Sequence, residues 1–355
     1  MFRSILLDCI ASISMERSTA SIFHLLVGKR SIQTLQDAKL YKITRYFGIC
    51  KHLDRNYFEQ EIKSLIIDNY ITVDQQNNAS ITRSGEAYLN IRIDSYPIHQ
   101  LNGFVFDRIS DLFWLRLQLW IQTYTNMARQ KGYFVAITDQ RDIQAWVKKL
   151  FQMHRDESDQ WLAGVYRELS SFLKAINPDL AQLFVDRLTG YQKIGLTMDQ
   201  LARKYQTTPI DMHLYLTITI HKLLTYLQER ENELIYLPVF YQFTKTSKKF
   251  ITNSAEKTYI LVKKGFDVEQ IAKIRQLKIN TIEDHIVEIA YIDPDFSIKP
   301  YVDQESFTII LAAIRNNKTA KLKQIKEMAG NNFSYFQIRL VLTYADFVQK
   351  EDLLK

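Results

Sequence analysis

The sequence predicts a mostly α-helical protein. Among its 355 residues there are only 10 Gly and 6 Pro, less than half the usual share of the residues that end helices and form turns. Apolar residues recur at helical spacing along most of the chain. A parallel α/β enzyme with glycine-rich ligand loops would be expected to contain more glycine. The composition therefore favours long helices joined by short links, as in a helical binding protein.

Composition and charge limit the function classes. Hydrophobic residues make up 46% and charged residues 24% of the chain, which are ordinary values for a globular protein. The net charge is +7 and the isoelectric point is about 9.1, so binding to nucleic acid or another polyanion is permitted. Two cysteines, Cys9 and Cys50, cannot form a disulfide framework and indicate a reducing compartment.

The chain shows no membrane or export signal. Asp8 interrupts the short apolar stretch at the start, and no small-residue cleavage site follows. The most apolar run, residues 112–121, is about half the length of a membrane span and contains Arg116 and Gln118. We therefore expect a cytoplasmic protein that does not enter the membrane.

Residues 15–95 have the element order of a winged helix. Three amphipathic segments come first, and then the apolar period changes from 3.6 to 2 residues. In the third segment Phe58, Ile62, Leu65 and Ile66 are expected on one apolar face. The predicted elements are helices near Ser18, from Ser31 to 47–48 and at 54–69 with Asp54 as N-cap, and strands at 70–73 and 79–82.

Residues 96–245 form a helical middle domain in which the four tryptophans are expected to be core residues. A helix-turn-helix pattern similar to that of sigma factors lies near 196–228. There Thr197 and Gln200 have capping-box spacing, and Thr208 precedes Pro209 at a predicted helix start.

Residues 246–355 contain the clearest helix-turn-helix. A helix at 254–264 precedes a capping-box pattern at Asp267 and Gln270, and a turn follows near 276–277. Asn280 is expected to cap the second helix of the motif, at 281–290. Two further helices, at 306–315 and 334–348, complete this domain. The predicted fold class is thus mostly α, with an N-terminal winged helix, a helical middle region with a helix-turn-helix, and a C-terminal helix-turn-helix domain.

Several segments resemble a known family. Residues 17–30, 46–48 and 81–89 resemble the winged helix that follows the motor of RecQ-type helicases, and Thr82, Gly85 and Leu89 fit the pattern Thr-x-x-Gly-x-x-x-Leu that closes the wing. Residues 265–286 resemble the helix-turn-helix at the C-terminus of some of those enzymes. The layout is similar to the YpbB-like proteins of Gram-positive bacteria, whose genes often neighbour a RecQ-type helicase. This resemblance implies a partnership with such a helicase.

The helicase motor is absent from the sequence. No G-x-x-x-x-G-K-[ST] loop occurs. Residues 156–159 have the letters of a helicase metal-binding box, but they lie in a polar helical stretch with no buried strand before them. The sequence therefore indicates the DNA-binding parts of a helicase without its nucleotide site.

The candidate DNA-binding residues lie in and beside the helix-turn-helix units. Asn56, Gln60 and Lys63 are expected on the outer face of the third winged-helix segment, where amides pair with adenine edges and lysine with phosphates. The wing tip, residues 75–78, has no aromatic residue to stack on an opened base pair. Basic clusters add the candidates Lys39, Lys42, Arg45, Lys248, Lys249, Lys263, Lys264, Lys273, Arg275 and Lys278.

A third basic cluster, with no acidic residue, comprises Arg315, Lys318, Lys321, Lys323 and Lys326. The C-terminal recognition helix instead presents Glu283, Asp284 and His285 at positions expected to be exposed. Two carboxylates near the start of this helix would repel phosphates. Either this domain contacts DNA through the preceding helix, with Lys263 and Lys264, or it is a protein-docking surface.

No catalytic or metal site is predicted. The sequence contains no H-E-x-x-H, no C-x-x-C and no G-x-S-x-G. We expect no catalytic residue, no metal, no cofactor and no small-molecule substrate. The main hypothesis is a non-enzymatic accessory that binds fork or duplex DNA and works with a separate RecQ-type helicase. The alternatives are a helix-turn-helix transcription regulator and a protein-interaction scaffold.

Overall fold

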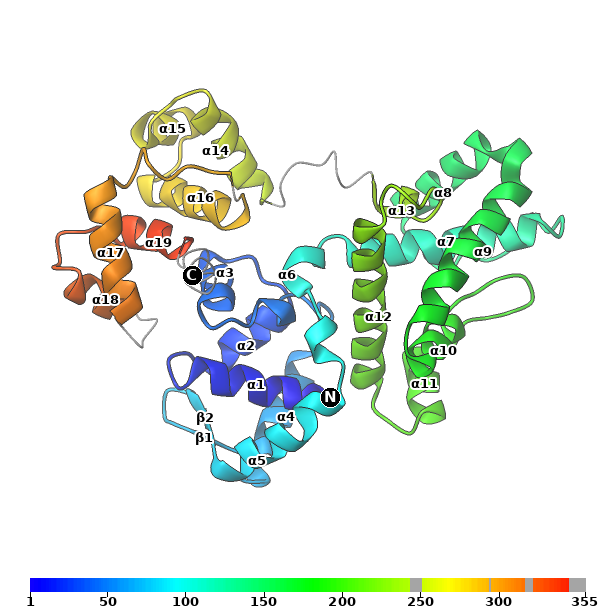
Figure 1. Ribbon diagram of the computed structural model, residues 1–355, viewed down its shortest axis with the longest axis horizontal. Helices are drawn as coiled ribbons and strands as arrows, with labels where there is room; N and C mark the ends of the chain where they lie inside the picture. The colour runs from blue at the N-terminus through cyan, green and yellow to red at the C-terminus, as the bar shows by residue number, and fades with distance from the viewer. Residues whose placement is uncertain (243–250, 294, 317–321, 345–355) are drawn as a thin grey trace. The chain divides into compact units, whose positions relative to one another are not determined.

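The computed structural model describes residues 1–242, 251–293, 295–316 and 322–344. As predicted, these residues are mostly helical, and their only sheet has two strands (Figure 1). The chain divides into two compact units. Unit 1 comprises residues 1–5, 48–52 and 88–247, and unit 2 comprises residues 6–47, 53–87 and 248–355. Within the described ranges, no helix combines the length and the apolar character needed to cross a membrane.

The N-terminal part of unit 2 contains three helices followed by a β-hairpin, in the predicted order. Ser31 and Asp54 cap the second and third helices through their side chains, as the sequence pattern indicates. The strands pair antiparallel with Ile71 opposite Ile81. These elements are α2 (Thr19–Leu26), α3 (Ile32–Leu40), α4 (Arg55–Ile67), β1 (Ile71–Val73) and β2 (Ala79–Ile81).

Three details differ from the prediction. Helix α3 ends at Leu40 instead of continuing to 47–48, because Lys42 adopts a left-handed backbone with φ of 57° and a 3₁₀ helix, Thr44–Tyr46, follows. Helices α1 (Phe2–Ile13) and α5 (Arg83–Arg92) are absent from the prediction, and each contributes residues to both units.

The Thr82-x-x-Gly85 pattern begins α5. The hydroxyl of Thr82 accepts a hydrogen bond from the backbone N–H of Gly85 at 3.1 Å and donates to the carbonyl oxygen of Asn69 at 2.6 Å. A Cβ at Gly85 would lie 2.1 Å from the carbonyl oxygen of Tyr70. This position therefore requires glycine, because the start of α5 lies directly against the residue that precedes β1.

The C-terminal part of unit 2 is a helical domain with the predicted helix-turn-helix at its start. Asp267 and Gln270 form the predicted capping box, and Gln276 makes the turn with a left-handed backbone. Its helices are α14 (Asn253–Lys263), α15 (Val268–Arg275), α16 (Ile279–Ile292), α17 (Gln304–Asn316), α18 (Leu322–Met328) and α19 (Tyr335–Leu342).

The start of α16 differs from the prediction, and α19 is described over only part of its predicted extent. The prediction that Asn280 caps α16 is wrong, because Lys278 takes the extended N-cap backbone directly after the turn and Asn280 lies inside the first turn. Helix α19 has a capping box formed by Ser334 and Gln337. Residues 345–348 of its predicted extent lie outside the described residues.

Unit 1 is built around the long helix α12 (Pro209–Glu229). The predicted caps are present, since Thr197 and Gln200 form a capping box and Thr208 caps α12 ahead of Pro209. The other helices of four or more residues are α6 (Gly103–Phe106), α7 (Ser110–Met127), α8 (Arg141–Met153), α9 (Ser158–Ala175), α10 (Pro178–Asp186), α11 (Met198–Lys204) and α13 (Val239–Gln242).

The tryptophans contribute to the core of unit 1, as predicted. Trp114, Trp120 and Trp161 are buried. Trp146 is half-buried, and its ring centroid lies 5.8 Å from that of Phe240. The predicted division into three domains at residues 95 and 245 stays a prediction.

Candidate nucleic-acid interface

Helix α4 presents an open polar face. Phe58, Ile62 and Leu65 are buried on its inner side. Asn56, Gln60 and Lys63 are exposed, and their spacing of four and three residues places them along one stripe. Helical periodicity alone predicts this arrangement, because α4 packs through a single apolar face. The amides of this stripe can donate to and accept from base edges, and Lys63 can contact a phosphate.

Acidic residues outnumber basic ones around this stripe, since residues 54–68 contain Asp54, Glu59, Glu61 and Asp68 but only Arg55 and Lys63. The carboxylate of Glu59 is 2.7 Å from the guanidinium of Arg55, which also lies 4.6 Å from the ring centre of Phe23. Ile67 continues the stripe and is 82% exposed. An exposed apolar residue on a groove-facing helix can contact a thymine methyl group. Ile66, predicted to face the core, is instead 43% exposed.

The first basic cluster is only partly accessible. The ammonium of Lys39 donates a hydrogen bond to the carbonyl oxygen of Tyr291 at 2.7 Å, so it is used inside unit 2. Arg45 is 43% exposed and lies 3.8 Å from the carboxylate of Asp8. Lys42 is exposed. Of these three candidates, Lys39 is the one that the structure assigns to an internal contact.

Helix α16, the expected recognition helix of the C-terminal domain, is largely covered. It packs against α14, α15 and α19 and, within unit 2, also against α3. The expectation that His285 is exposed is wrong, because its side chain is buried. Asp284 does not project freely either, since it forms an ion pair with Arg339 at 2.8 Å. Ile279 and Asn280 in the first turn are exposed, and the paired side chain of Asp284 is 45% exposed, whereas residues 285–291 are buried. Helix α16 therefore cannot enter a DNA groove along its length.

Arg275 is committed to the domain interior. Its guanidinium donates to the carbonyl oxygen of Ser254 at 2.7 Å and to the hydroxyl of Thr258 at 2.5 Å. Nδ1 of His285 lies 3.2 Å from the same guanidinium nitrogen and 3.0 Å from the hydroxyl of Thr258. Burial, followed by the charge of Arg275, lowers the pKa of His285. We therefore assign Arg275 a structural contact instead of the predicted phosphate contact.

The remaining lysines of the C-terminal domain are mostly on its surface. Four of these lysines are exposed: Lys263 and Lys264, at the end of α14, and Lys273 and Lys278, on either side of the turn of the helix-turn-helix. Lys323 is exposed, whereas the ammonium of Lys326 lies 5.0 Å from the ring centre of Tyr335. The predicted residues Lys248, Lys249, Lys318 and Lys321 lie outside the described part of the chain. The lysines near the turn are the accessible cations of the motif.

The middle helix-turn-helix is not built to read a groove. Helices α11 and α12 form at the predicted positions, but buried residues cover several faces of α12. Its N-terminus is also covered, because Asp211 accepts hydrogen bonds from the amino group of Met1 at 3.2 Å and from the N–H of Phe2 at 2.8 Å. Helix α12 is therefore the core helix of unit 1. Of the three expected recognition helices, α4 alone offers a continuous exposed face.

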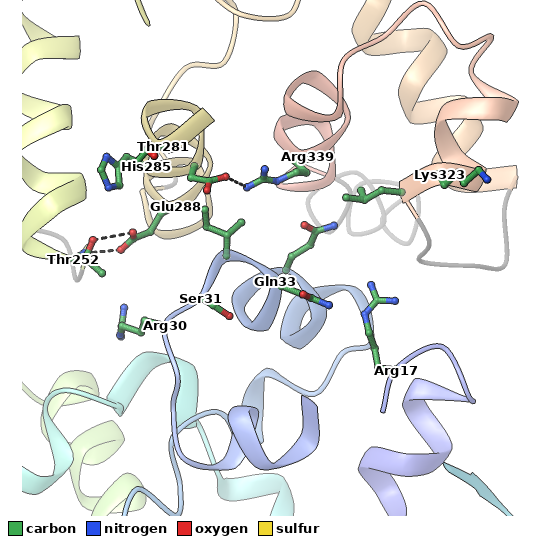
Figure 2. A pocket seen from close by; sticks show the side chains of 14 residues that line it. Arg17, Arg30, Ser31, Gln33, Thr252, Thr281, His285, Glu288, Lys323 and Arg339 are labelled. Atoms are coloured by element: carbon green, nitrogen blue, oxygen red, sulfur yellow. Dashed lines mark hydrogen bonds and ion pairs between the residues drawn. The ribbon is translucent and has the colours of Figure 1, made fainter. Parts of the chain in front are cut away.

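A cleft of about 950 Å³ lies in unit 2 between α3 and the helices of the C-terminal domain (Figure 2). The carboxylate of Asp284 is paired with Arg339, and that of Glu288 accepts from the N–H of Thr252 at 2.6 Å and from its hydroxyl at 3.0 Å. Both carboxylates thus have partners within the wall. The basic residues that line the cleft are Arg17, Arg30, Lys323 and Arg339.

The cleft has the chemistry to accept an anionic group. Its lining has four basic side chains and two carboxylates, of which Arg339 and Asp284 pair with each other, and guanidinium groups suit phosphate oxygens. Arg17 is itself paired with Asp37 at 2.9 Å. The sequence gives no signal for this cleft, because its lining residues come from segments far apart in the chain.

The described residues show no group of three or more His, Cys, Asp or Glu side chains that could hold a metal ion. The acidic residues at 156–159 begin in the 3₁₀ helix Arg155–Glu157 and continue into α9. Asp156 and Asp159 are exposed, and the element directly before them is helix α8, not a strand. Their context is therefore that of a surface turn.

Comparison with known proteins agrees with the helix-turn-helix geometry. Residues 254–342 match a family described as a helix-turn-helix domain. The chain is 33% identical to Protein YpbB of Bacillus subtilis (strain 168) over 345 residues. This aligned stretch covers 96% of this chain and 97% of that protein. No solved structure matches the chain significantly. With this identity over nearly its full length, the chain belongs to the YpbB family.

Proposed function

We propose that this protein is a non-enzymatic DNA-binding accessory that works with a separate RecQ-type helicase in replication, recombination or repair. The observation that carries the DNA-binding part is the exposed stripe of Asn56, Gln60 and Lys63 on α4. This helix is the last of α2, α3 and α4, which precede the hairpin in the element order of a winged helix. We take residues 15–95 to be that winged helix.

The C-terminal helix-turn-helix domain supports the same proposal. Its exposed Lys263, Lys264, Lys273 and Lys278 would contact phosphates, while α16 remains inside the domain. Lys42 and Arg45 would add phosphate contacts near α3. The helicase partnership rests on the resemblance of residues 17–30, 81–89 and 265–286 to parts of RecQ-type enzymes. The protein would act by tethering its partner to DNA.

The test is DNA binding by the full chain, measured by fluorescence anisotropy with labelled duplex and fork DNA. The affinity should fall steeply as salt rises from about 50 to 200 mM, because each neutralised phosphate releases counterions. The triple variant Asn56→Ala, Gln60→Ala, Lys63→Ala should bind at least about tenfold more weakly. A matched control replaces Lys174 and Gln228, which are exposed in unit 1, with alanine. Equal affinities of the two variants, or affinity that ignores salt, would contradict the proposal.

The choice of DNA also separates the accessory from a transcription regulator. A regulator predicts one preferred duplex sequence, whereas an accessory to a helicase predicts preference for a structure such as a fork. The helix that would read a promoter in the middle region, α12, has buried residues on several faces. Similar binding to unrelated duplexes and tighter binding to forks would support the accessory.

A second candidate function is a protein-interaction scaffold. The observation that favours it is the pair Ile274 and Ile279, which flank the turn of the C-terminal helix-turn-helix and are 53% and 47% exposed. Apolar side chains at a motif with a covered second helix suit protein docking. This function predicts a partner that is retained after nuclease treatment and is lost when both isoleucines are changed to serine.

A further inference from the structure

The connection between α7 and α8, whose backbone can be followed in Figure 1, has two large exposed side chains. Tyr133 is 102% exposed and Val135 is 91% exposed, so neither ring nor methyl groups are covered by unit 1. Tyrosine in a folded protein normally buries most of its ring, because removing its large apolar area from water is favourable. Tyr133 and Val135 therefore form an exposed apolar surface that a binding partner could cover.

The main chain on both sides of Tyr133 is anchored. The backbone N–H of Lys131 donates to the carbonyl oxygen of Asn126 at 3.0 Å, at the end of α7. The amide of Gln122, which is only 5% exposed, donates to the carbonyl oxygen of Val135 at 2.9 Å and accepts from the N–H of Ile137 at 3.0 Å. The buried side chain of Gln122 thus fixes the backbone of the connection through two hydrogen bonds.

This anchoring matters because a pre-ordered segment loses little conformational entropy when it binds. Further along, the side chain of Gln144 in α8 donates to the carbonyl oxygen of Thr138 at 2.8 Å. The connection is therefore tied to α7 at two places and to α8 at a third. Tyr133 stands between the first two ties, where its position is set by the fold of unit 1.

The charges around Tyr133 select the class of ligand. Of the charged residues in the connection, Arg129 and Lys131 lie nearest to Tyr133 along the chain, and both are exposed. The carboxylate of the connection, Asp139, is also exposed and lies six residues beyond Tyr133. An aromatic face beside cations that can follow a phosphate backbone is the arrangement by which proteins bind single-stranded nucleic acid. An acidic protein partner would find the same cations, but it would not require a planar ring at the tip.

We propose that Tyr133 stacks against an unpaired base of single-stranded DNA while Arg129 and Lys131 contact the flanking phosphates. This inference rests on the proposed DNA-binding function and assigns the single strand of a fork to unit 1. Val135 adds apolar contact to the same or the neighbouring base. The predicted wing tip at 75–78 has no aromatic residue, whereas this connection has a fully exposed tyrosine.

The experiment uses the full chain and a single-stranded oligothymidine that carries one central 2-aminopurine. Its fluorescence is quenched when the base stacks, and anisotropy of an end label gives the affinity. Tyr133→Ala should lower the affinity by about 5- to 150-fold, the range that corresponds to the loss of one stacked base, and should change the 2-aminopurine signal. Tyr133→Phe should retain both, because stacking needs the ring and not the hydroxyl.

The matched control is Tyr166→Ala, since Tyr166 is another exposed tyrosine of unit 1, at 73%. It should bind the oligonucleotide as the unchanged protein does. If the unchanged protein binds no form of DNA, the proposed function itself fails. If it binds DNA but Tyr133→Ala has the same affinity and the same 2-aminopurine signal, the inference is overturned while the proposed function stands. A variant that keeps its DNA affinity but loses a co-purifying protein would show a protein-docking surface instead, which also overturns it.

Discussion

The ammonium of Lys39 in α3 donates a hydrogen bond to the main-chain oxygen of Tyr291 in the last turn of α16, at 2.7 Å. The same ammonium lies 5.0 Å from the centre of the Tyr291 ring. Carbonyl oxygens in the last turn of a helix have no partner within the helix, and a cation there is favoured by the helix dipole. Lys39 therefore stabilises the packing of α3 against α16 within unit 2.

Lys39→Met should destabilise the fold without weakening DNA binding. A hydrogen bond from a charged donor contributes about 1–3 kcal/mol, so the midpoint of urea denaturation, followed by circular dichroism, should fall. The exposed Lys42 gives the comparison, because Lys42→Met should leave this midpoint unchanged and reduce the salt dependence of DNA affinity by about one unit of slope. The opposite pattern for the two lysines would refute the assignment of Lys39 to an internal contact.

Arg275 and its neighbouring lysines should separate in the same way. Arg275→Met removes the hydrogen bonds that the carbonyl oxygen of Ser254 and the hydroxyl of Thr258 accept. We therefore expect the free energy of unfolding to fall by about 1–3 kcal/mol. The charge reversals Lys273→Glu and Lys278→Glu should leave stability nearly unchanged. Together they should lower DNA affinity by about tenfold or more. Thermal unfolding and anisotropy measured on both proteins provide the check.

Gly85→Ala should disrupt the junction between the hairpin and α5. The added Cβ would lie 2.1 Å from the carbonyl oxygen of Tyr70 and 2.8 Å from a side-chain carbon of Ile81, so the backbone must shift. We expect a loss of about 1–3 kcal/mol, as for other overpacked sites, seen as a lower temperature of thermal unfolding.

Gly132→Ala is the control for this substitution, because no atom lies within 4 Å of the Cβ position there. Its unfolding temperature should match that of the unchanged protein. Equal unfolding temperatures for both alanine variants would show that the contact at Gly85 is relieved without cost.

Stability should decline as the pH falls below about 6.5, in part because of His221. Nδ1 of this buried residue accepts from the N–H of Asn102 at 3.0 Å, and burial lowers its pKa from 6.5 to about 3. The unfolded chain then binds a proton that the folded chain does not bind between these two values. The stabilising contribution is present above pH 6.5 and is lost at about 1.4 kcal/mol per pH unit towards pH 3.

His221→Asn tests this linkage, since the asparagine oxygen can replace Nδ1 as an acceptor but does not titrate. Between pH 6 and pH 4 the free energy of unfolding of this variant should decrease less steeply than that of the unchanged protein. The two slopes should differ by about 1.4 kcal/mol per pH unit, which corresponds to one proton. An unchanged slope for His221→Asn would mean that His221 is protonated in the folded chain.

The sequence by itself predicts the helices, their caps and the outer face of α4. Helical periodicity and capping are local properties, so Phe58, Ile62 and Leu65 determine that Asn56, Gln60 and Lys63 point outward, and Asp267 with Gln270 determines where α15 begins. The same local pattern is misleading for α16. There His285 occupies an expected outer position, yet Thr258 and Arg275 contact it from two other helices.

Only the tertiary structure decided which basic and acidic residues are accessible. The chemistry of a lysine or glutamate is visible in the sequence, but its partner is contributed by a distant segment: Tyr291 for Lys39, Arg339 for Asp284 and Thr252 for Glu288. A buried charge is retained only where such a partner offsets its desolvation. The sequence thus determined a basic helical protein with helix-turn-helix units, and the packing decided that α4, not α12 or α16, presents the open face.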